Sequence, residues 1–354
     1  MCVFRVDLKE ILNNFNKVKS ILDKKTKICV VAKANAYGFG IKKICSLLKL
    51  KADYFAVARL SEFLKIKELD IKKPILILSP LLENDMKVAI AQGAEIEISN
   101  LFMLEMANKI ASRKKTLAKV HLKLDTGMSR YGIKDAKELC VILDKLKCMK
   151  NVELIGCFSH LCYAENKDIS EKQREKFIEF KNIVKKYGFD PIFHLANSCG
   201  LKDKRNEFDM VRLGFDLYNS KSSKHSFEAN IVEIKTIKKE EGISYNHEFV
   251  ANKDMKIAVC SAGYADGVPR TLSNKAKVLI GNKQCDVVGN VCMDAFMANI
   301  SEVCHAKVGD RVIIFGSDKE NSISVCEMAQ ICDTIPYEIY TRISDRVKRV
   351  YKWR

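Results

Sequence analysis

The sequence has no apolar run that approaches the roughly 20 residues of a membrane-spanning helix, and its N-terminus lacks the basic and then apolar stretches of a secretion signal. Its 14 cysteines are scattered, without a Cys-x-x-Cys pair or the framework of a small disulfide-rich domain, which favours reduced cysteines. Cys157, His160 and Cys162 lie close together, but no second pair of ligands accompanies them, so no metal site is expected. We therefore expect a cytoplasmic protein without a membrane span.

The balance of charge is basic, with 61 lysines and arginines against 44 aspartates and glutamates and a formal net charge of +17. Such an excess can favour nucleic acid or an anionic membrane surface as a partner. The lysines are, however, spread over the whole chain, as on a solvated surface. The densest basic cluster, residues 346–354, alternates with apolar residues as a strand does. We therefore expect neither nucleic acid nor a membrane as a partner.

Strand-like apolar runs alternate with amphipathic helical stretches through the first part of the chain, after an opening helix at 8–22. Eight such repeats predict an α/β fold, a TIM-type (β/α)₈ barrel. The predicted strands are residues 27–34, 54–58, 75–79, 95–99, 119–125, 153–160, 192–198 and 210–218.

The pattern changes near residue 226, where helical periodicity fades and short runs separated by Gly, Asn and Asp turns begin. These runs predict a smaller, mostly-β C-terminal domain with one helical insert at 324–332. The predicted domains are therefore 1–225 and 226–354. The predicted strands of the second domain are residues 230–237, 256–261, 277–280, 285–288, 296–300 and 311–315.

A lysine, Lys33, follows directly after the apolar run that predicts the first barrel strand. An unpaired ammonium group in an apolar layer is costly, so burial at this position would lower the lysine pKa and produce a nucleophilic amine. The alternative is a lysine whose side chain reaches out of the barrel mouth into solvent. Asn35, Gly38 and Gly40 predict that the strand ends here in a turn.

Other polar residues lie at the ends of predicted barrel strands, where barrel enzymes place their chemistry. Lys123 and Arg130 flank a turn that a salt bridge could equally explain, and His160 could equally be a structural histidine. Ser198 begins a helix-like segment after the seventh strand, and Gly214 follows the eighth. Hydroxyl and backbone N–H groups at these two strands are a recurrent phosphate site of barrels.

The ten residues 31–40 resemble the signature around the pyridoxal-phosphate lysine of the alanine racemase family, with Phe39 where many members have histidine. The resemblance extends from Val31 to about Val350 through further segments in the family's order. It implies the barrel-plus-β fold and a pyridoxal 5'-phosphate-dependent isomerase that interconverts L- and D-alanine, supplying D-alanine for cell-wall peptidoglycan. It also implies a homodimer with shared active sites. The further segments are residues 123–132, 194–198, 211–215, 261–270 and 289–294.

The resemblance assigns the cofactor contacts residue by residue. Lys33 matches the Schiff-base lysine, Tyr37 a phosphate contact and His160 the histidine that stacks on the cofactor ring. Arg212 matches the arginine that faces the pyridine nitrogen. The residues matched to the phosphate region are Asn197, Ser198, Gly214 and Phe215.

An arginine beside the pyridine nitrogen has a chemical consequence. Because the guanidinium group does not give up its proton, the ring nitrogen stays largely unprotonated and the cofactor is a weaker electron sink. This limits side reactions such as transamination and favours a racemase over a transaminase.

Arg130 matches the arginine that faces the cofactor's phenolic oxygen and the substrate carboxylate, and Lys123 matches a lysine that can be carbamylated and then orients that arginine. Met293 matches a residue whose backbone N–H meets the substrate carboxylate. Asp294 is expected to fix the local network.

Racemisation needs two acid–base groups on opposite faces of a planar intermediate. Lys33 can serve one face, and Tyr264 matches the family's second base, which comes from the partner subunit. Since an unperturbed tyrosine pKa near 10 makes a poor base at neutral pH, neighbouring groups must help. His194 and Arg212 resemble the residues that do so.

One departure from the family bears on the substrate. Asp345 stands where a tyrosine closes the alanine pocket, so either Tyr340 substitutes from nearby or the specificity is not strictly for alanine. The alternatives are a serine or broad-specificity racemase, a decarboxylase of the same fold, and a non-catalytic pyridoxal-phosphate-binding protein. A pure carrier has no need of Tyr264.

Overall fold

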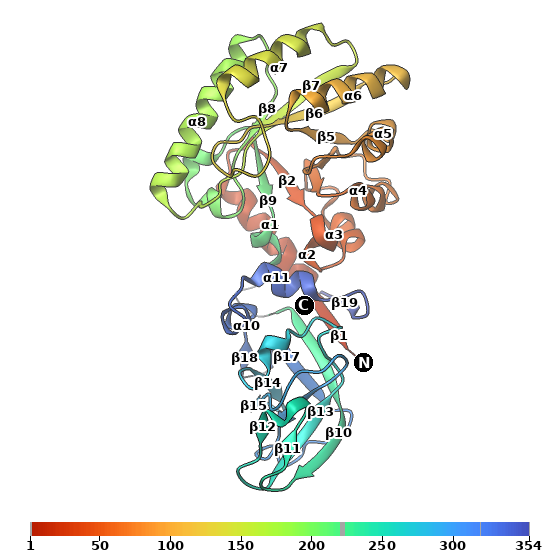
Figure 1. Cartoon of the computed structure of the whole chain (residues 1–354), viewed down its shortest axis with the longest axis vertical. Coiled ribbons are helices and arrows are strands. Elements are labelled where there is room, and N and C mark those ends of the chain that lie inside the picture. The colour runs from red at the N-terminus through yellow and green to blue at the C-terminus, as the bar shows by residue number, and fades with distance from the viewer. Residues whose placement is uncertain (1, 220–223, 319, 354) are drawn as a thin grey trace. The chain divides into compact units, whose positions relative to one another are not determined.

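The computed structural model describes residues 2–219, 224–318 and 320–353, which divide into two compact units. The barrel unit comprises Phe15–Ala36 and Ile41–Leu217, and the β unit comprises Met1–Asn14, Tyr37–Gly40 and Tyr218–Arg354. In Figure 1 the labels β2 and β5 to β9 mark barrel strands, and the labels β1, β10 to β15 and β17 to β19 mark strands of the β unit. The segments 1–14 and 37–40, which the sequence analysis placed in the first domain, group with the C-terminal part.

The barrel unit contains an eight-stranded parallel sheet in the order β8-β7-β6-β5-β4-β3-β2-β9. The two end strands approach each other, because Asp209 N donates to Phe193 O at 3.0 Å and Arg212 N donates to Ala196 O at 3.0 Å. Every predicted barrel strand is present, which confirms the TIM-type barrel. The strands are β2 (Lys27–Val31), β3 (Tyr54–Val57), β4 (Ile75–Ile77), β5 (Glu95–Ile98), β6 (Ala118–Lys123), β7 (Val152–Phe158), β8 (Ile192–His194) and β9 (Met210–Leu213).

Amphipathic helices connect these strands and lie outside the sheet (Figure 1). Asn100, Asp135 and Asn166 cap three of them with a side-chain oxygen that accepts a backbone N–H of the first turn. The longer helices are α1 (Leu8–Ile21), α3 (Ile41–Leu48), α4 (Leu60–Lys67), α5 (Glu83–Ala91), α6 (Leu101–Arg113), α7 (Ala136–Cys148) and α8 (Lys167–Lys186). Among the helices of the described residues, none is long and apolar enough to cross a membrane.

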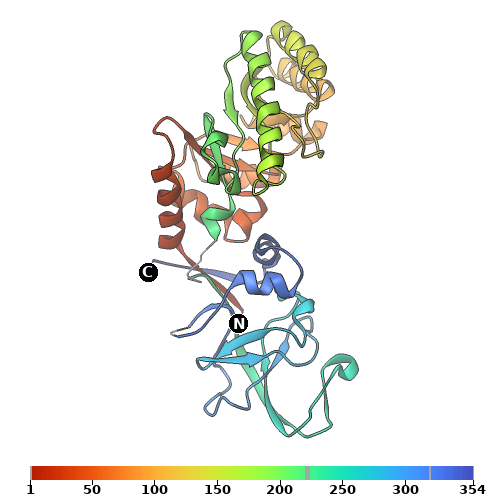
Figure 2. The same ribbon diagram turned by 90° about the vertical axis from the view of Figure 1, so that its left-hand side faces the viewer.

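The β unit is built on a nine-stranded sheet, which confirms a mostly-β C-terminal domain (Figure 2). Its larger strands are β1 (Val3–Asp7), β10 (Ser226–Ile237), β13 (Met255–Cys260), β14 (Lys277–Ile280), β15 (Lys283–Asp286), β16 (Phe296–Asn299), β17 (Arg311–Ser317) and β19 (Lys348–Lys352). The shorter elements are β11 (Gly242–Ile243), β12 (Phe249–Val250), β18 (Ser322–Ile323), α10 (Val325–Ile331) and α11 (Pro336–Arg342).

The N-terminal strand explains why the first residues belong to the β unit. β1 pairs antiparallel with β10 and parallel with β19, so the two ends of the chain share one sheet. Phe4 of β1 contacts Phe39 with ring centroids 5.0 Å apart, and Phe39 contacts Tyr340 at 4.9 Å. This aromatic core therefore also fixes the segment 37–40 in the β unit.

Candidate active site

The chain leaves β2 through a left-handed turn directly after Lys33. Residues 34–37 have φ between 52° and 54°, and none of them is glycine. Such backbone costs roughly 1–2 kcal/mol per residue and is characteristic of functional sites. Asn35 stabilises the turn, because its Oδ1 accepts the N–H of Ile41 at 2.9 Å. The turn, labelled α2 (Lys33–Tyr37), holds Lys33 at the end of the strand.

The surroundings of Lys33 make its ammonium group easier to deprotonate. Burial lowers the pKa of Lys33, and the positive charges of Arg130 and Arg212 lower it further. Glu62 opposes this effect, but its carboxylate already accepts the N–H groups of Ala34 at 2.6 Å and Ala58 at 2.9 Å. The side chain therefore has the electrostatic environment of a nucleophilic lysine.

Lys123, at the end of β6, is more deeply buried, with 2% of the residue exposed. Burial and the neighbouring cations Arg212 and Arg130 lower its pKa to about 7, against the weaker effects of Asp125 and Glu97. Its Nζ atom has no hydrogen-bond partner among the described residues. Asp125 is occupied elsewhere, since one of its oxygens accepts three backbone N–H groups of residues 127–129. A buried amine is therefore free to react or to meet a ligand.

His160, which follows β7, is affected by the charges of both lysines and both arginines named above. Burial lowers the pKa of His160 to about 3, with further contributions from Arg212, Lys123, Lys33 and Arg130, in that order. The positive charges of four side chains, which lie in or directly after β2, β6 and β9, thus act on this one imidazole. Such a region of positive potential suits a ligand with several negative charges.

Arg212, on β9, is fixed by four hydrogen bonds inside the barrel. Its Nη1 donates to His194 Nδ1 and to His194 O, both at 2.9 Å, and its Nη2 donates to Ser159 O at 2.6 Å and to Leu195 O at 3.0 Å. Burial lowers the Arg212 pKa to about 10, which leaves the guanidinium charged at neutral pH. Burial and the Arg212 charge hold the pKa of His194 well below its usual range, so this imidazole is neutral.

The residues matched to the phosphate region lie together in the barrel unit. Ser198 Oγ accepts the N–H groups of Gly214 at 3.2 Å and Asp216 at 3.3 Å. Asn197 Oδ1 accepts the N–H of Gly200 at 2.8 Å. Short helical segments begin directly after Ser198, with η1 (Cys199–Lys202), and after Gly214, with α9 (Phe215–Tyr218).

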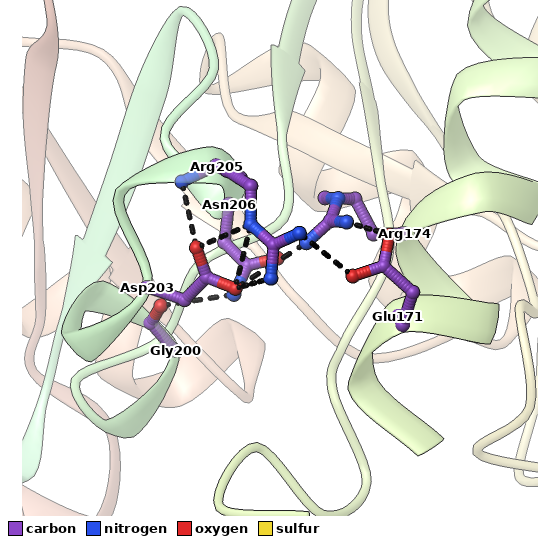
Figure 3. Close-up of polar contacts among 6 residues, drawn as sticks. All are labelled: Glu171, Arg174, Gly200, Asp203, Arg205 and Asn206. Atoms are coloured by element: carbon purple, nitrogen blue, oxygen red, sulfur yellow. Dashed lines mark hydrogen bonds and ion pairs between the residues drawn. The ribbon is translucent and has the colours of Figure 1, made fainter. Parts of the chain in front are cut away.

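An ionic cluster stabilises the loop that follows Ser198 (Figure 3). The buried Arg174 of α8 bonds Glu171 and, at 3.3 Å, Asp203. Arg205 bonds Asp203 at 2.7 Å and Glu171 at 3.0 Å, and Asn206 Nδ2 donates to Gly200 O at 3.0 Å. The cluster joins the loop to α8 and so holds the phosphate region in place.

Tyr264, in the β unit, lies on a rigid backbone platform. Its N–H donates to Cys292 O at 3.0 Å, and the N–H of Ala265 donates to Met293 O at 3.1 Å. Gly263 allows this close approach, because a Cβ atom there would lie 2.2 Å from Met293 O. The two segments matched to the family are thereby brought together. Tyr264 and Met293 are 45% and 53% exposed.

The remaining predicted residues of the β unit have well-defined partners. Asp294 accepts a hydrogen bond from Arg346 Nη2 at 2.7 Å. Tyr37 is buried and stacks on Tyr218 with ring centroids 4.8 Å apart, and burial raises its pKa to about 12. Tyr340 is 2% exposed within the aromatic core of the unit, so its ring is not available as a substitute for the tyrosine missing at Asp345.

The sequence analysis missed Glu95 and His121, which lie buried beside His194. His121 Nδ1 is 3.0 Å from His194 Nε2, and His121 Nε2 is 2.8 Å from Glu95 Oε2. It also missed Glu97, whose pKa burial raises to about 7. The available signal was the presence of charged residues and a histidine inside apolar strands, where an unpaired polar group is costly.

Comparisons with known proteins identify the family of the chain. Models of the N-terminal and C-terminal domains of alanine racemase match residues 6–222 and 225–351. The fold and these matches define the class: an amino-acid racemase built from a barrel and a β domain. The chain belongs to the alanine racemase family.

Individual relatives cover nearly the whole chain. Alanine racemase 2 of Caldanaerobacter subterraneus subsp. tengcongensis is 35% identical, over 99% of this chain and 94% of the relative. The solved alanine racemase of Clostridium difficile 630 has a TM-score of 0.93 and 31% identity, over 99% of this chain and 96% of that chain. A Bacillus anthracis alanine racemase solved with bound L-Ala-P has a TM-score of 0.92 and 32% identity, over 99% of this chain and 95% of that chain.

Proposed function

We propose that this protein is a pyridoxal 5'-phosphate-dependent alanine racemase that interconverts L- and D-alanine. The observation that carries the proposal is the set of four basic side chains whose charges all act on His160, which includes two lysines of lowered pKa, in a chain of this family. The barrel unit binds the cofactor, and the β unit supplies the second base.

The barrel residues fit the cofactor group by group. Lys33 would hold it covalently, His160 would lie against its ring, and Arg212 would face its pyridine nitrogen. When bound, pyridoxal phosphate acidifies the Cα–H bond of an amino acid by accepting electron density. Ser198, with the N–H groups of Gly214 and Asp216 already directed at its hydroxyl, supports a phosphate site formed with Asn197 and Phe215.

Two residues move the proton. Burial makes the Lys33 amine easier to deprotonate, so Lys33 removes or returns the Cα proton on one face of the substrate. Tyr264 acts on the opposite face. The exposure of Tyr264 and Met293 on a hydrogen-bonded platform supports a role in the active site of a second copy. The protein is accordingly a homodimer with shared sites, in which His194 and Arg212 assist Tyr264.

Lys123 is proposed to be carbamylated. Its buried Nζ has no partner among the described residues, and a pKa near 7 leaves much of the amine neutral and able to attack carbon dioxide. The resulting anion would balance the charge of Arg130. Arg130 would then be oriented to bind the substrate carboxylate together with the backbone N–H of Met293, whose neighbour Asp294 is held by Arg346.

In the cell, the enzyme would act in the cytoplasm on a free amino acid and supply D-alanine for peptidoglycan. Neither nucleic acid nor a membrane is a partner in this proposal.

Asp345 favours a second candidate, a racemase that also accepts serine. The residue is exposed and carries a carboxylate where the family has a tyrosine, which could enlarge and polarise the pocket. Replacement Asp345→Tyr should then reduce serine turnover relative to alanine turnover, and unchanged selectivity would eliminate this candidate.

Proton NMR of the cofactor-loaded protein in deuterated water tests the proposal. L-Alanine should lose its Cα proton while D-alanine forms, and L-serine measured in parallel gives the substrate range. The Lys33→Ala variant should lose the activity. A cofactor-loaded wild type that exchanges no Cα proton from either amino acid would refute the proposal in favour of a carrier or a decarboxylase.

A further inference from the structure

Four buried side chains form a continuous hydrogen-bonded chain through the interior of the barrel. It runs from Arg212 Nη1 to His194 Nδ1 at 2.9 Å, from His194 Nε2 to His121 Nδ1 at 3.0 Å, and from His121 Nε2 to Glu95 Oε2 at 2.8 Å. The side chains come from β9, β8, β6 and β5, and none of the four residues is more than 4% exposed.

Only one arrangement of protons satisfies all three contacts. Arg212 can only donate, so Nδ1 of the neutral His194 accepts and its Nε2 carries the proton. His121 must then accept at Nδ1, so it carries its own proton on Nε2 and donates it to Glu95. The chain is therefore directed from the guanidinium group to the carboxylate.

The chain also provides a counter-charge for Arg212. A buried cation is costly unless it is paired, yet the four hydrogen bonds of its Nη atoms go to carbonyl oxygens and an imidazole. Among the ion pairs of the described residues, Glu95 pairs only with His121. The carboxylate at the far end thus balances the guanidinium charge through two imidazole rings.

The barrel makes room for the central ring of the chain. The ladder between β6 and β7 shifts register between Val120 and His121, which places His121 opposite Gly156. A Cβ atom at position 156 would lie 2.1 Å from His121 Nδ1. Any larger residue would displace the ring, so the glycine is required for the His121 contact with His194.

We propose that Glu95 and His121 are positioning residues which, through His194, fix the orientation of the charged Arg212 toward the pyridine nitrogen of the cofactor. The inference rests on the proposed function, which assigns Arg212 to that nitrogen. Glu95 and His121 touch neither cofactor nor substrate. They act by holding Nη1 from inside the barrel, so that the guanidinium plane cannot rotate.

The first test reads the proton positions directly, by ¹⁵N NMR of histidine-labelled protein without cofactor. His121 and His194 should both be protonated at Nε2 alone. Glu95→Gln removes the charge but keeps an acceptor oxygen. Although Glu95 and His194 are two hydrogen bonds apart, the variant should shift the ¹⁵N signals of His194. Glu97→Gln is the matched control, since Glu97 is equally buried on the same strand but accepts from Ser99 instead. An Nδ1-protonated ring, or equal shifts in the two variants, would overturn the proposal.

The second test isolates the pyridine nitrogen. The cofactor-free wild type and Glu95→Gln are titrated with pyridoxal phosphate and with an analogue in which the ring nitrogen is replaced by CH. We expect Glu95→Gln to weaken pyridoxal phosphate binding by about tenfold, as for one charge-assisted hydrogen bond, and analogue binding by less than about twofold.

The outcomes separate this inference from the proposed function. If the wild type binds and racemises normally but Glu95→Gln weakens both ligands equally, Glu95 is merely structural and the inference fails alone. If the wild type does not bind pyridoxal phosphate, the proposed function fails and this inference fails with it.

Discussion

Replacing Lys123 by methionine should stabilise the protein in a pH-dependent manner. Lys123 is 2% exposed, and burial lowers its pKa to about 7. The ordinary lysine pKa of about 10.4 applies to the unfolded chain. At about 1.36 kcal/mol per unit of pKa, the buried ammonium group costs on the order of 4–5 kcal/mol at low pH. Methionine fills similar space without a charge.

The sign follows from proton binding. Between pH 7 and 10.4 the unfolded wild type binds more protons than the folded one, so wild-type stability rises with pH in this window. The advantage of Lys123→Met is therefore full below about pH 7 and decreases by up to about 1.4 kcal/mol per pH unit above it. The loss of Lys123 also raises the pKa of Glu97 further, because the ammonium charge no longer stabilises the carboxylate. This too makes the stability advantage of Lys123→Met decrease as the pH rises.

Urea denaturation of cofactor-free protein at several pH values between 6.5 and 9.5, in buffer freed of carbon dioxide, measures this difference. Lys119→Met removes an exposed lysine of the same strand and is the matched control. A Lys123→Met variant that is less stable than the wild type at pH 7, or whose advantage does not change with pH, would refute the reasoning.

Two further predictions concern the packing around the site. Gly263→Ala should lower the free energy of unfolding by about 2–3 kcal/mol, because its Cβ would lie 2.2 Å from Met293 O; a loss below about 0.5 kcal/mol in urea denaturation would contradict it. Arg174→Met should cost about 2 kcal/mol, because Asp203 and Glu171 lose a buried charged donor and keep only the exposed Arg205. The exposed Arg205→Ala should cost clearly less, and equal losses in the same assay would show that burial of Arg174 does not matter.

The barrel could be predicted from the sequence because each strand is a local signal, an apolar run that ends in a polar turn. The predicted strands extend too far at their C-terminal ends, because the residues after each strand already belong to the connection that follows. The first strand ends at Val31 instead of residue 34. β1 was missed because its partners, β10 and β19, are more than 200 residues away in the sequence. Local patterns carry no information about such pairing.

The candidate site residues came mainly from the family resemblance, and their roles remain predictions. The left-handed turn after Lys33 could not be read from residues 34–37, because none of them is a glycine. Glu95 and His121 were missed for a different reason. Their strands were recognised, but the interior of a closed barrel holds polar groups that only the three-dimensional network satisfies.

Exchange of the Cα proton of L- and D-alanine in deuterated water, by the cofactor-loaded wild type and the Tyr264→Phe variant, tests the two-base account most directly. The wild type should exchange both enantiomers. Because each base serves one face of the substrate, Tyr264→Phe should still exchange one enantiomer but lose exchange of the other by about 10²-fold or more. Equal exchange of both enantiomers by the variant, or an equal loss of both, would contradict the assignment of Lys33 and Tyr264 to opposite faces.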